Sequence, residues 1–220
     1  MATLDSLRKR SQALIRKGLD GAIFIAPYTE ETEITELLSS DGQLNALPSG
    51  YVDVGHITKD QGVSWTRDIN VEDVESLGVA EPTRRDVTSD VTGLEFTMQE
   101  SKAKTIELYE GIDLSSVTAQ AAGETHSNIS YDKPDRPALI FYRALALFKD
   151  GEGADAFYFA KWMPRCQVTD RGEQSWNEGS EVQYPVTMTG FNDDAFGTSV
   201  RTLWGFPTKL LETAGFKTGE

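Results

Sequence analysis

Few side chains in this sequence are of the types that catalyse reactions or bind metals. Cys166 is the only cysteine, and the only histidines are His56 and His126. Structural zinc sites need clustered Cys and His ligands, and these three residues are far apart in the chain. A Cys166 nucleophile with either histidine is compatible with the spacing, but a cysteine in a strand is more often an inert packing residue. We therefore expect Cys166 to be buried, and we expect no metal and no cofactor.

Two short motifs match part of the signature of serine penicillin-recognising enzymes. Residues 101–104 fit S-x-x-K and residues 217–219 fit K-T-G. The third motif, S-D-N, is absent, and K-T-G belongs on a core strand rather than near a charged chain end. P-loop, dinucleotide-binding and nucleophile-elbow motifs are also absent. An enzyme built on Ser101, Lys104 or Cys166 is therefore the weakest of three hypotheses, and we expect no enzymatic activity.

Composition and charge exclude several classes of protein. The 220 residues are 39% hydrophobic and 25% charged, which is typical of one soluble globular body. The longest apolar stretch, residues 138–148, is interrupted by Arg143 and is shorter than the ~20 residues of a membrane helix. The N-terminus lacks the pattern of a secretory signal, so we expect a cytosolic protein when it is made. A net charge of −14 argues against tight nucleic-acid binding, which needs Lys and Arg at the phosphates.

The charge is unevenly distributed. Residues 1–20 hold five basic side chains against two acidic ones, a net charge of +3, so the other 200 residues carry −17. Leu4, Leu7, Leu14 and Ile15 lie near helical spacing in this segment. We expect a basic N-terminal arm or short helix that either docks on an acidic surface, including one on another copy, or presents a solvated face.

Alternating patterns predict a mainly β fold. Residues 63–69 and 182–188 alternate apolar and polar side chains, and Pro185 favours a sheet edge or a bulge for the second strand. Residues 139–148 and 156–163 are apolar on both faces and flank the turn sequence 150–153, which predicts a central hairpin. Further strands are expected near residues 22–25, 51–55, 91–97, 165–169 and 199–204. A small β-sandwich or barrel fits this pattern.

One helix is expected to flank the sheet. It spans about residues 98–110, starting from a capping box of Thr97 and Glu100 and ending at Gly111. The polar stretches 27–49 and 68–90 are too long for ordinary loops of a compact domain, so we expect them to be functional. We divide the chain into the arm 1–20, a β domain 21–206 and a C-terminal tail 207–220, and we expect both ends to be mobile.

Several segments, in order, resemble the major tail tube proteins of bacteriophages with long noncontractile tails. The resemblance spans roughly residues 22–206, and its segments are residues 24–27, the Gly-Tyr-Val-Asp-Val-Gly-His-containing stretch 50–63, and residues 79–90, 94–100, 107–114, 145–148, 156–163 and 165–173. The basic N-terminal 20 residues are a departure from this pattern.

The resemblance implies a non-enzymatic virion protein: a β-sandwich with one flanking helix, assembled as hexameric rings that stack into the conduit for DNA ejection. It makes the loop 68–90 a contact between rings or subunits, with Arg67, Asp68, Glu81, Arg84, Arg85 and Asp86 as candidates. It also implies that neighbouring subunits cover the second apolar face of the central hairpin. An acidic lumen would repel DNA, which meets the tube only in passage, and the candidates for it are Glu173, Glu178 and Glu181. The implied partners are further copies of the chain, a tape-measure protein, and tail terminator and tail-tip proteins, with no membrane. The implied location is the virion tail, after assembly in the host cytoplasm.

A soluble β-sandwich that binds a carbohydrate or a receptor is the alternative. In that hypothesis a ligand face is formed by the four tryptophans Trp65, Trp162, Trp176 and Trp204. Aromatic side chains more often fill cores, which favours the tube hypothesis.

Overall fold

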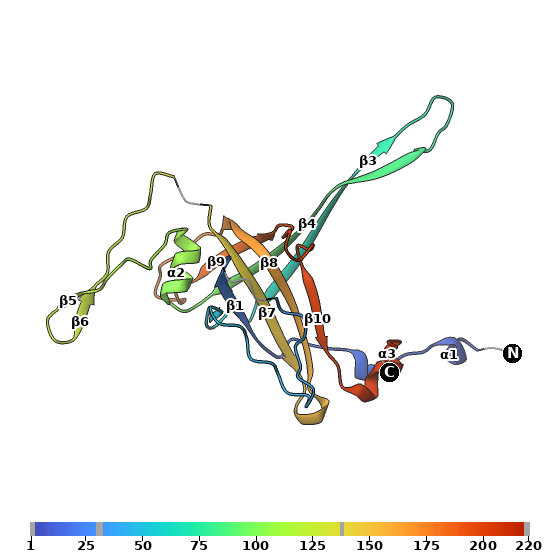
Figure 1. Cartoon of the computed structure of the whole chain (residues 1–220), viewed down its shortest axis with the longest axis horizontal. Helices are drawn as coiled ribbons and strands as arrows, with labels where there is room; N and C mark the ends of the chain where they lie inside the picture. The colour runs from blue at the N-terminus through green and yellow to red at the C-terminus, as the bar shows by residue number, and fades with distance from the viewer. Residues whose placement is uncertain (1–2, 30–32, 137–138, 218–220) are drawn as a thin grey trace.

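The computed structural model describes residues 3–29, 33–136 and 139–217. Its strands are β1 (Asp20–Pro27), β2 (Val52–Asp53), β3 (Val63–Val74), β4 (Arg84–Met98), β5 (Gln120–Ala122), β6 (His126–Asn128), β7 (Phe141–Asp150), β8 (Phe157–Arg171), β9 (Tyr184–Gly190) and β10 (Arg201–Gly205). Its helices are α1 (Leu4–Leu7), α2 (Ala103–Glu110) and α3 (Leu211–Ala214), with 3₁₀ turns η1 (Gln12–Leu14), η2 (Gly153–Asp155) and η3 (Thr208–Leu210). Figure 1 shows a central β body from which several segments project.

The described strands form one large antiparallel sheet and one small hairpin. The large sheet has the order β2-β1-β7-β8-β9-β4-β3, and β10 also pairs with β8. The long strand β8 is shared, because its first half pairs with β10 and its second half pairs with β9. The small hairpin joins β5 to β6 and projects on the side of the body opposite to β3 (Figure 1).

The large sheet closes on itself into a barrel. The chain that leaves β2 runs beside the end of β4, where Ile57 forms a bridge with Met98. Two backbone bonds flank this bridge: Thr58 N donates to Thr97 O over 3.0 Å, and Gln99 N donates to His56 O over 2.9 Å. Since β2 also pairs with β1, the path of strands returns to its start. The prediction of a mainly β, barrel-like fold is therefore confirmed.

The barrel interior is filled by alternate residues of every long strand, as a period of two requires. Ile23 and Ile25 of β1, Phe96 of β4 and Met188 of β9 belong to this buried cluster. A second cluster lies on the outer face of β7 and β8, where Leu145 and Trp162 are covered by Ile34, Leu37 and Leu203. The second apolar face of the central hairpin is thus buried by residues of the same chain, and the expectation that a neighbouring subunit covers it is wrong.

Helix α2 closes one end of the barrel. Leu108 is fully buried in the interior cluster, and the Thr105 hydroxyl donates to Val54 O over 3.1 Å. The helix ends at Gly111, whose φ of +70° is the left-handed conformation that glycine adopts without strain. It begins at Ala103 rather than near residue 98. The predicted capping box is wrong because Thr97 lies within β4 and the Glu100 carboxylate bonds to His56 instead.

Two other expectations require correction. Residues 68–90 are not an irregular loop: β3 and β4 pair along their whole length, with a register shift between Asn70 and Val71, and only residues 75–83 form the connection. The strand predicted at residues 182–188 is β9, which lies between β8 and β4, so the edge alternative is wrong. The pairing of β9 with β8 does contain a register shift, between Val168 and Asp170 of β8. Pro185 is tolerated there because it lies at the end of the β8–β9 ladder, where its carbonyl accepts from Gly172 N over 3.1 Å and no proline N–H is needed.

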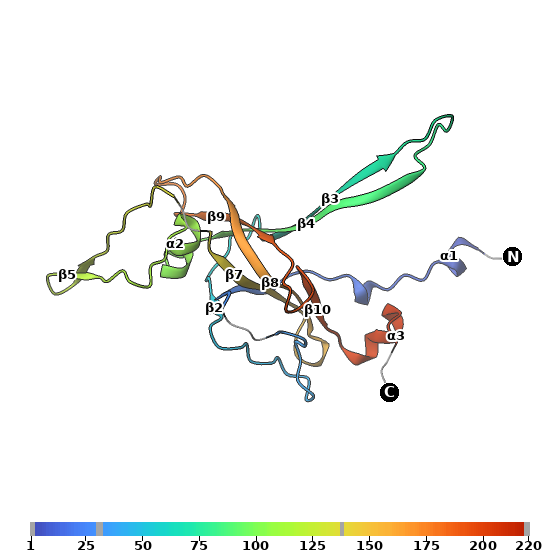
Figure 2. The same cartoon turned by 45° about the horizontal axis from the view of Figure 1, so that its top comes forward.

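The central hairpin β7–β8 is confirmed, with Phe141–Asp150 antiparallel to Phe157–Arg171. Outside the barrel, the described part of the N-terminal arm, from residue 3 onward, has α1 and η1 as separate short elements, so the amphipathic pattern does not become one continuous helix. Figure 2 shows the arm, α3 and the β3–β4 hairpin extending away from the body on the same side. Among the helices of residues 3–29, 33–136 and 139–217, none has the length and hydropathy needed to cross a membrane.

Candidate assembly surfaces

The β3–β4 hairpin projects well beyond the barrel (Figures 1 and 2) and is the most extended paired element of the described chain. Residues directly opposite each other in an antiparallel pair share a face of the sheet. The register therefore sorts the projecting side chains into two faces. We call one the neutral face, which holds Arg67, Ile69, Val71, Asp73, Arg85, Val87 and Asp90. We call the other the acidic face, which holds Asp68, Asn70, Glu72, Val74, Arg84, Asp86, Ser89 and Val91.

Two two-pronged ion pairs cross the neutral face. Arg67 donates to both carboxylate oxygens of Asp90 over 2.8 and 2.5 Å, and Arg85 donates to both oxygens of Asp73 over 2.6 and 2.8 Å. These hydrogen bonds lower the pKa values of Asp90 and Asp73 and raise those of the two arginines. All four charges are compensated on this face, and the apolar Val71 and Val87 lie opposite each other between the two pairs.

The acidic face has a different balance. Asp68, Glu72 and Asp86 oppose the single guanidinium of Arg84, which pairs with Asp86 at 2.8 Å. Of the six predicted contact residues, Arg67 and Arg85 thus lie on the neutral face, and Asp68, Arg84 and Asp86 lie on the acidic face.

The tip of the hairpin is held by polar bonds at its base. Thr83 N donates to Val74 O over 2.9 Å, and the hydroxyls of Ser76 and Thr83 lie 2.8 Å apart. Beyond them Leu77 is fully exposed, and Glu81, the sixth predicted contact residue, is exposed as well. The tip therefore presents an apolar side chain to water.

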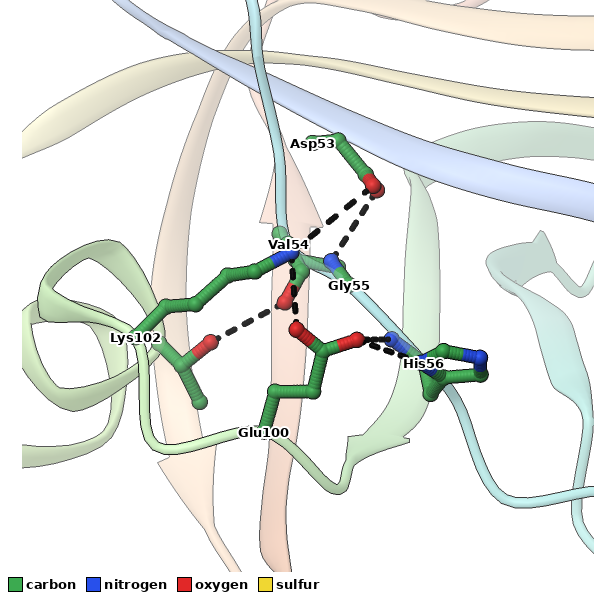
Figure 3. A network of polar contacts seen from close by, with 7 residues as sticks. Asp53, Val54, Gly55, His56, Glu100 and Lys102 are labelled. Carbon is green, nitrogen blue, oxygen red and sulfur yellow. Dashed lines mark hydrogen bonds and ion pairs between the residues drawn. The ribbon is translucent and has the colours of Figure 1, made fainter.

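A polar clasp joins the barrel seam to the start of α2 (Figure 3). The Glu100 carboxylate accepts a hydrogen bond from His56 N over 2.7 Å. It also lies 2.5 Å from His56 Nδ1 and 2.9 Å from Lys102 Nζ. These bonds lower the pKa of Glu100 from 4.5 to about 2, and the bond from Lys102 contributes most. Gly55 has a φ of +93°, and a Cβ there would lie 2.5 Å from the Glu100 carboxyl carbon. Asp53 completes the clasp by accepting from Gly55 N over 3.0 Å.

The clasp was not predicted from the sequence. Glu100 matched a local capping box, whereas its actual partner His56 is 44 residues away in the chain. The available signal was Gly55 inside the segment 50–63, since glycine is the residue that allows a left-handed backbone and the close approach of another group.

The N-terminal arm is fixed to the barrel at its last residues. Arg16 lies 3.7 Å from the Asp150 carboxylate and 4.6 Å above the Phe157 ring, and Lys17 N donates to Asp150 over 3.2 Å. These contacts join the arm to the β7–β8 turn. The part of the arm before them, which holds the exposed Leu4 and Leu7, extends away from the body (Figure 1).

The predicted lumen residues lie in the connection between β8 and β9. Glu173, Glu178 and Glu181 are all exposed. Glu181 accepts hydrogen bonds from Gln99 over 2.6 Å and Gln183 over 3.0 Å, and the first of these is the main cause of its lowered pKa. The three carboxylates thus lie on one connecting segment, and Glu181 is also hydrogen-bonded to Gln99, which directly follows β4.

The four tryptophans of the ligand-binding alternative do not share one face. Trp162 is fully buried and donates from Nε1 to the Tyr51 hydroxyl over 2.7 Å. Trp65 and Trp204 line a common groove of about 350 Å³ with Phe148 and Phe159. Trp176 is exposed on the β8–β9 connection and does not line that groove.

The residues of the enzyme hypothesis are separated and engaged in structural bonds. The Ser101 hydroxyl lies 2.8 Å from the Tyr184 hydroxyl, and Lys104 pairs with Glu107 at 2.6 Å. Cys166 is fully buried, as expected, and burial raises the pKa of its thiol. Thr218 and Gly219 of the K-T-G match lie outside the described residues. Within the described ranges, no group of three or more His, Cys, Asp or Glu side chains is arranged to hold a metal ion.

Comparison with known proteins decides the family. Residues 10–202 match the family model described as phage tail tube protein. The chain belongs to the phage tail tube protein family. As a tail tube protein it is a structural subunit of a virion tail. The match covers the barrel and the β3–β4 hairpin, and it begins within the N-terminal arm.

Solved structures similar to this tail tube protein are distant. A chain of the virion of a native gene transfer agent particle is 10% identical, with a TM-score of 0.41, over 81% of this chain and 96% of that chain. A chain of the tail of an empty gene transfer agent particle with C6 symmetry is 10% identical, with a TM-score of 0.39, over 81% and 96%. A crystal structure of Hcp protein is 11% identical, with a TM-score of 0.31, over 82% and 97%. None of the curated proteins compared with the chain matches it.

Proposed function

We propose that this tail tube protein forms hexameric rings, and that the rings stack into the conduit through which DNA leaves the capsid. The observation that carries the proposal is the family match over residues 10–202. The hairpin supports the stacking step, because two strands alone are at best marginally stable in water and this pair exposes apolar side chains along its length. The ring size follows the family resemblance.

The hairpin is the proposed contact between rings or neighbouring subunits. Its contact residues would be Arg67, Asp68, Glu81, Arg84, Arg85 and Asp86, all of which are exposed or half-buried in the single chain. Because these side chains carry both signs of charge, they favour one register of approach and disfavour others. The N-terminal arm and the C-terminal tail would become ordered on stacking in the same way.

Glu173, Glu178 and Glu181 are the proposed acidic residues of the lumen. Their exposure in one connection supports a role on a surface. Carboxylates that face DNA repel its phosphates and give no counterion release, so DNA passes without binding.

The remaining parts of the proposal concern partners and place. The tube would enclose a tape-measure protein, end in terminator and tail-tip proteins, and assemble in the host cytoplasm without a membrane. The protein would act without catalysis, which the structural engagement of Ser101 and Lys104 and the burial of Cys166 support.

Electron microscopy of the purified protein over a concentration series, with light scattering for mass, tests the function. Rings or hollow tubes with sixfold symmetry are the expected result. A protein that stays monomeric at every concentration and binds a sugar or peptide would contradict self-assembly and favour the ligand-binding alternative.

A further inference from the structure

The two faces of the β3–β4 hairpin are unequal, and the difference indicates how the hairpin docks. We propose that the neutral face lies against a second copy of this chain and that the acidic face remains in water. This inference rests on the proposed function, since it assumes that copies assemble. It adds which side of the hairpin is the interface. Of the six proposed contact residues, it keeps Arg67 and Arg85 at the interface and leaves Asp68, Arg84 and Asp86, which lie on the acidic face, in water.

The first argument is continuity with the barrel core. The pairs Val63–Phe96 and Trp65–Leu94 share the face that continues outward as the neutral face. Phe96 and Leu94 are buried inside the barrel, and Val63 and Trp65 pack against that core. The side of β3 and β4 that faces the barrel core is therefore the same side that carries the neutral face. In the projecting part of the hairpin this side is exposed to water.

The second argument is electrostatic. Each copy carries a net charge of −14, so two copies repel each other unless their contact surfaces are locally compensated. On the neutral face both arginines are already paired with both aspartates, and these pairs keep their hydrogen bonds when covered. On the acidic face, three carboxylates oppose one guanidinium. Covering that face would desolvate carboxylates that lack a compensating charge, which is costly.

The third argument is the placement of apolar side chains. Ile69, Val71 and Val87 are contiguous on the neutral face, and they are 46%, 47% and 66% exposed. On the acidic face, Val74 and Val91 lie near opposite ends, with Glu72 and Asp86 between them. Only the neutral face offers a continuous apolar stripe, and such a stripe gains free energy when a partner removes it from water.

A matched set of substitutions separates the two faces. Val71→Asp and Val87→Asp place a carboxylate on the neutral face, whereas Val91→Asp places the same carboxylate on the acidic face of the same hairpin. Val91 is 41% exposed, close to the 47% of Val71. Val91 lies opposite Asp68 and Val71 lies opposite Val87, so Val91→Asp also adds a like-charge pair within the single chain, and the stability of each monomer is measured first. Circular dichroism and thermal unfolding of each monomer verify that it folds, and Val87, the most exposed of the three, remains usable if Val71→Asp does not.

The readout is the protein concentration at which light scattering and electron microscopy first detect tubes. We expect Val71→Asp and Val87→Asp to raise this concentration at least about tenfold, because each buries an unpaired charge at every contact. Val91→Asp should change it by less than about twofold. Loss of assembly in Val91→Asp, or unchanged assembly in both neutral-face variants, would overturn the inference while leaving the tube function intact. A wild-type chain that never assembles would instead overturn the proposed function, and this inference with it.

Discussion

Replacing Gly55 by alanine tests the polar clasp that closes the barrel. Gly55 has a φ of +93°, so an alanine there is strained whatever its surroundings. It would also place a methyl carbon 2.5 Å from the Glu100 carboxyl carbon and 2.6 and 2.7 Å from the two oxygens. Non-bonded carbon atoms are favourable only near 3.5–4.0 Å, so the carboxylate must move by about 1 Å.

The loss of stability in Gly55→Ala has two causes, the strained backbone at residue 55 and the displaced carboxylate of Glu100. Alanine in the left-handed region costs about 1–2 kcal/mol, which lowers the melting temperature of a domain of this size by roughly 2–8 °C. A displacement of about 1 Å also lengthens the 2.7 Å bond from His56 N beyond hydrogen-bond range. We therefore expect Gly55→Ala to lower the melting temperature at least about twice as much as backbone strain alone does.

Gly62 provides the matched control for this measurement. It lies in the same connection between β2 and β3, has a φ of +58°, and has nothing within 4 Å of the position of an added Cβ. Gly62→Ala therefore measures the backbone part alone. Thermal and urea unfolding of the monomer, followed by circular dichroism, would compare it with Gly55→Ala.

A double substitution shows whether Glu100 is the cause. In a Glu100→Ala background the obstructing carboxylate is gone, so Gly55→Ala should lower stability by no more than Gly62→Ala does. Equal effects of Gly55→Ala and Gly62→Ala in the otherwise wild-type chain would refute the close approach. An unchanged effect of Gly55→Ala in the Glu100→Ala background would refute the role of the carboxylate.

Three further predictions concern single side chains. The pKa of Glu100 is lowered from 4.5 to about 2 in the folded chain, so its stabilising effect is complete above pH 4.5 and is lost as the pH falls toward 2. The stability difference between wild type and Glu100→Gln in urea unfolding should shrink over that range, and a constant difference would contradict the clasp. Asp193 and Arg143 form a buried pair at 3.6 Å, so Asp193→Ala should lower the free energy of unfolding by about 3–5 kcal/mol, whereas the exposed Asp194→Ala should change it by less than about 0.5 kcal/mol. Cys166 is fully buried and its thiol pKa is raised, so a thiol reagent should react slowly with the folded chain and rapidly in urea; fast reaction without urea would show that the barrel opens.

The central hairpin was predictable because its signals are local. Two apolar runs flank the Asp-Gly-Glu-Gly turn at 150–153, and β7 and β8 pair directly across it. The two apolar faces were also visible in the sequence. The partner of the outer face was not, because Ile34 and Leu37 lie in a polar stretch more than 100 residues before the strands that they cover.

The projecting part of the β3–β4 hairpin, residues 68–90, was interpreted as a loop for a physical reason, whereas the strand ends at 63–69 and 91–97 were predicted. Strand patterns are recognised when one face is buried and the other is wet, and both faces of this hairpin are exposed in the single chain. Arginine and aspartate therefore occupy positions where a core strand would carry apolar residues, as Arg67 and Asp73 do. The charges were noticed as contact candidates, but their division into two faces follows only from the strand register.

The start of α2 shows how tertiary contacts override local patterns. Thr97 and Glu100 have the spacing of a capping box, yet Thr97 is in the β4 ladder and Glu100 is bound to His56 across the barrel seam. The helix end was predicted correctly because Gly111 acts through its own backbone conformation, which needs no distant partner.

The anchor at Arg16 sets a length scale for the N-terminal arm. Residues 3–15 precede the contact with Asp150 and Phe157, and a fully extended chain spans at most about 3.3–3.6 Å per residue. The described part of the arm therefore reaches at most about 45 Å from the β7–β8 turn. Arg8, Lys9 and Arg10 are six to eight residues before the anchor, so their backbone reaches at most about 20–29 Å from it. Any acidic surface that binds them must lie within that distance plus the length of one side chain. Deleting residues between Ser11 and Ile15 would shorten this distance without removing these basic side chains. A series of such deletions would therefore measure how far apart the arm of one subunit and its binding surface on a neighbouring subunit lie.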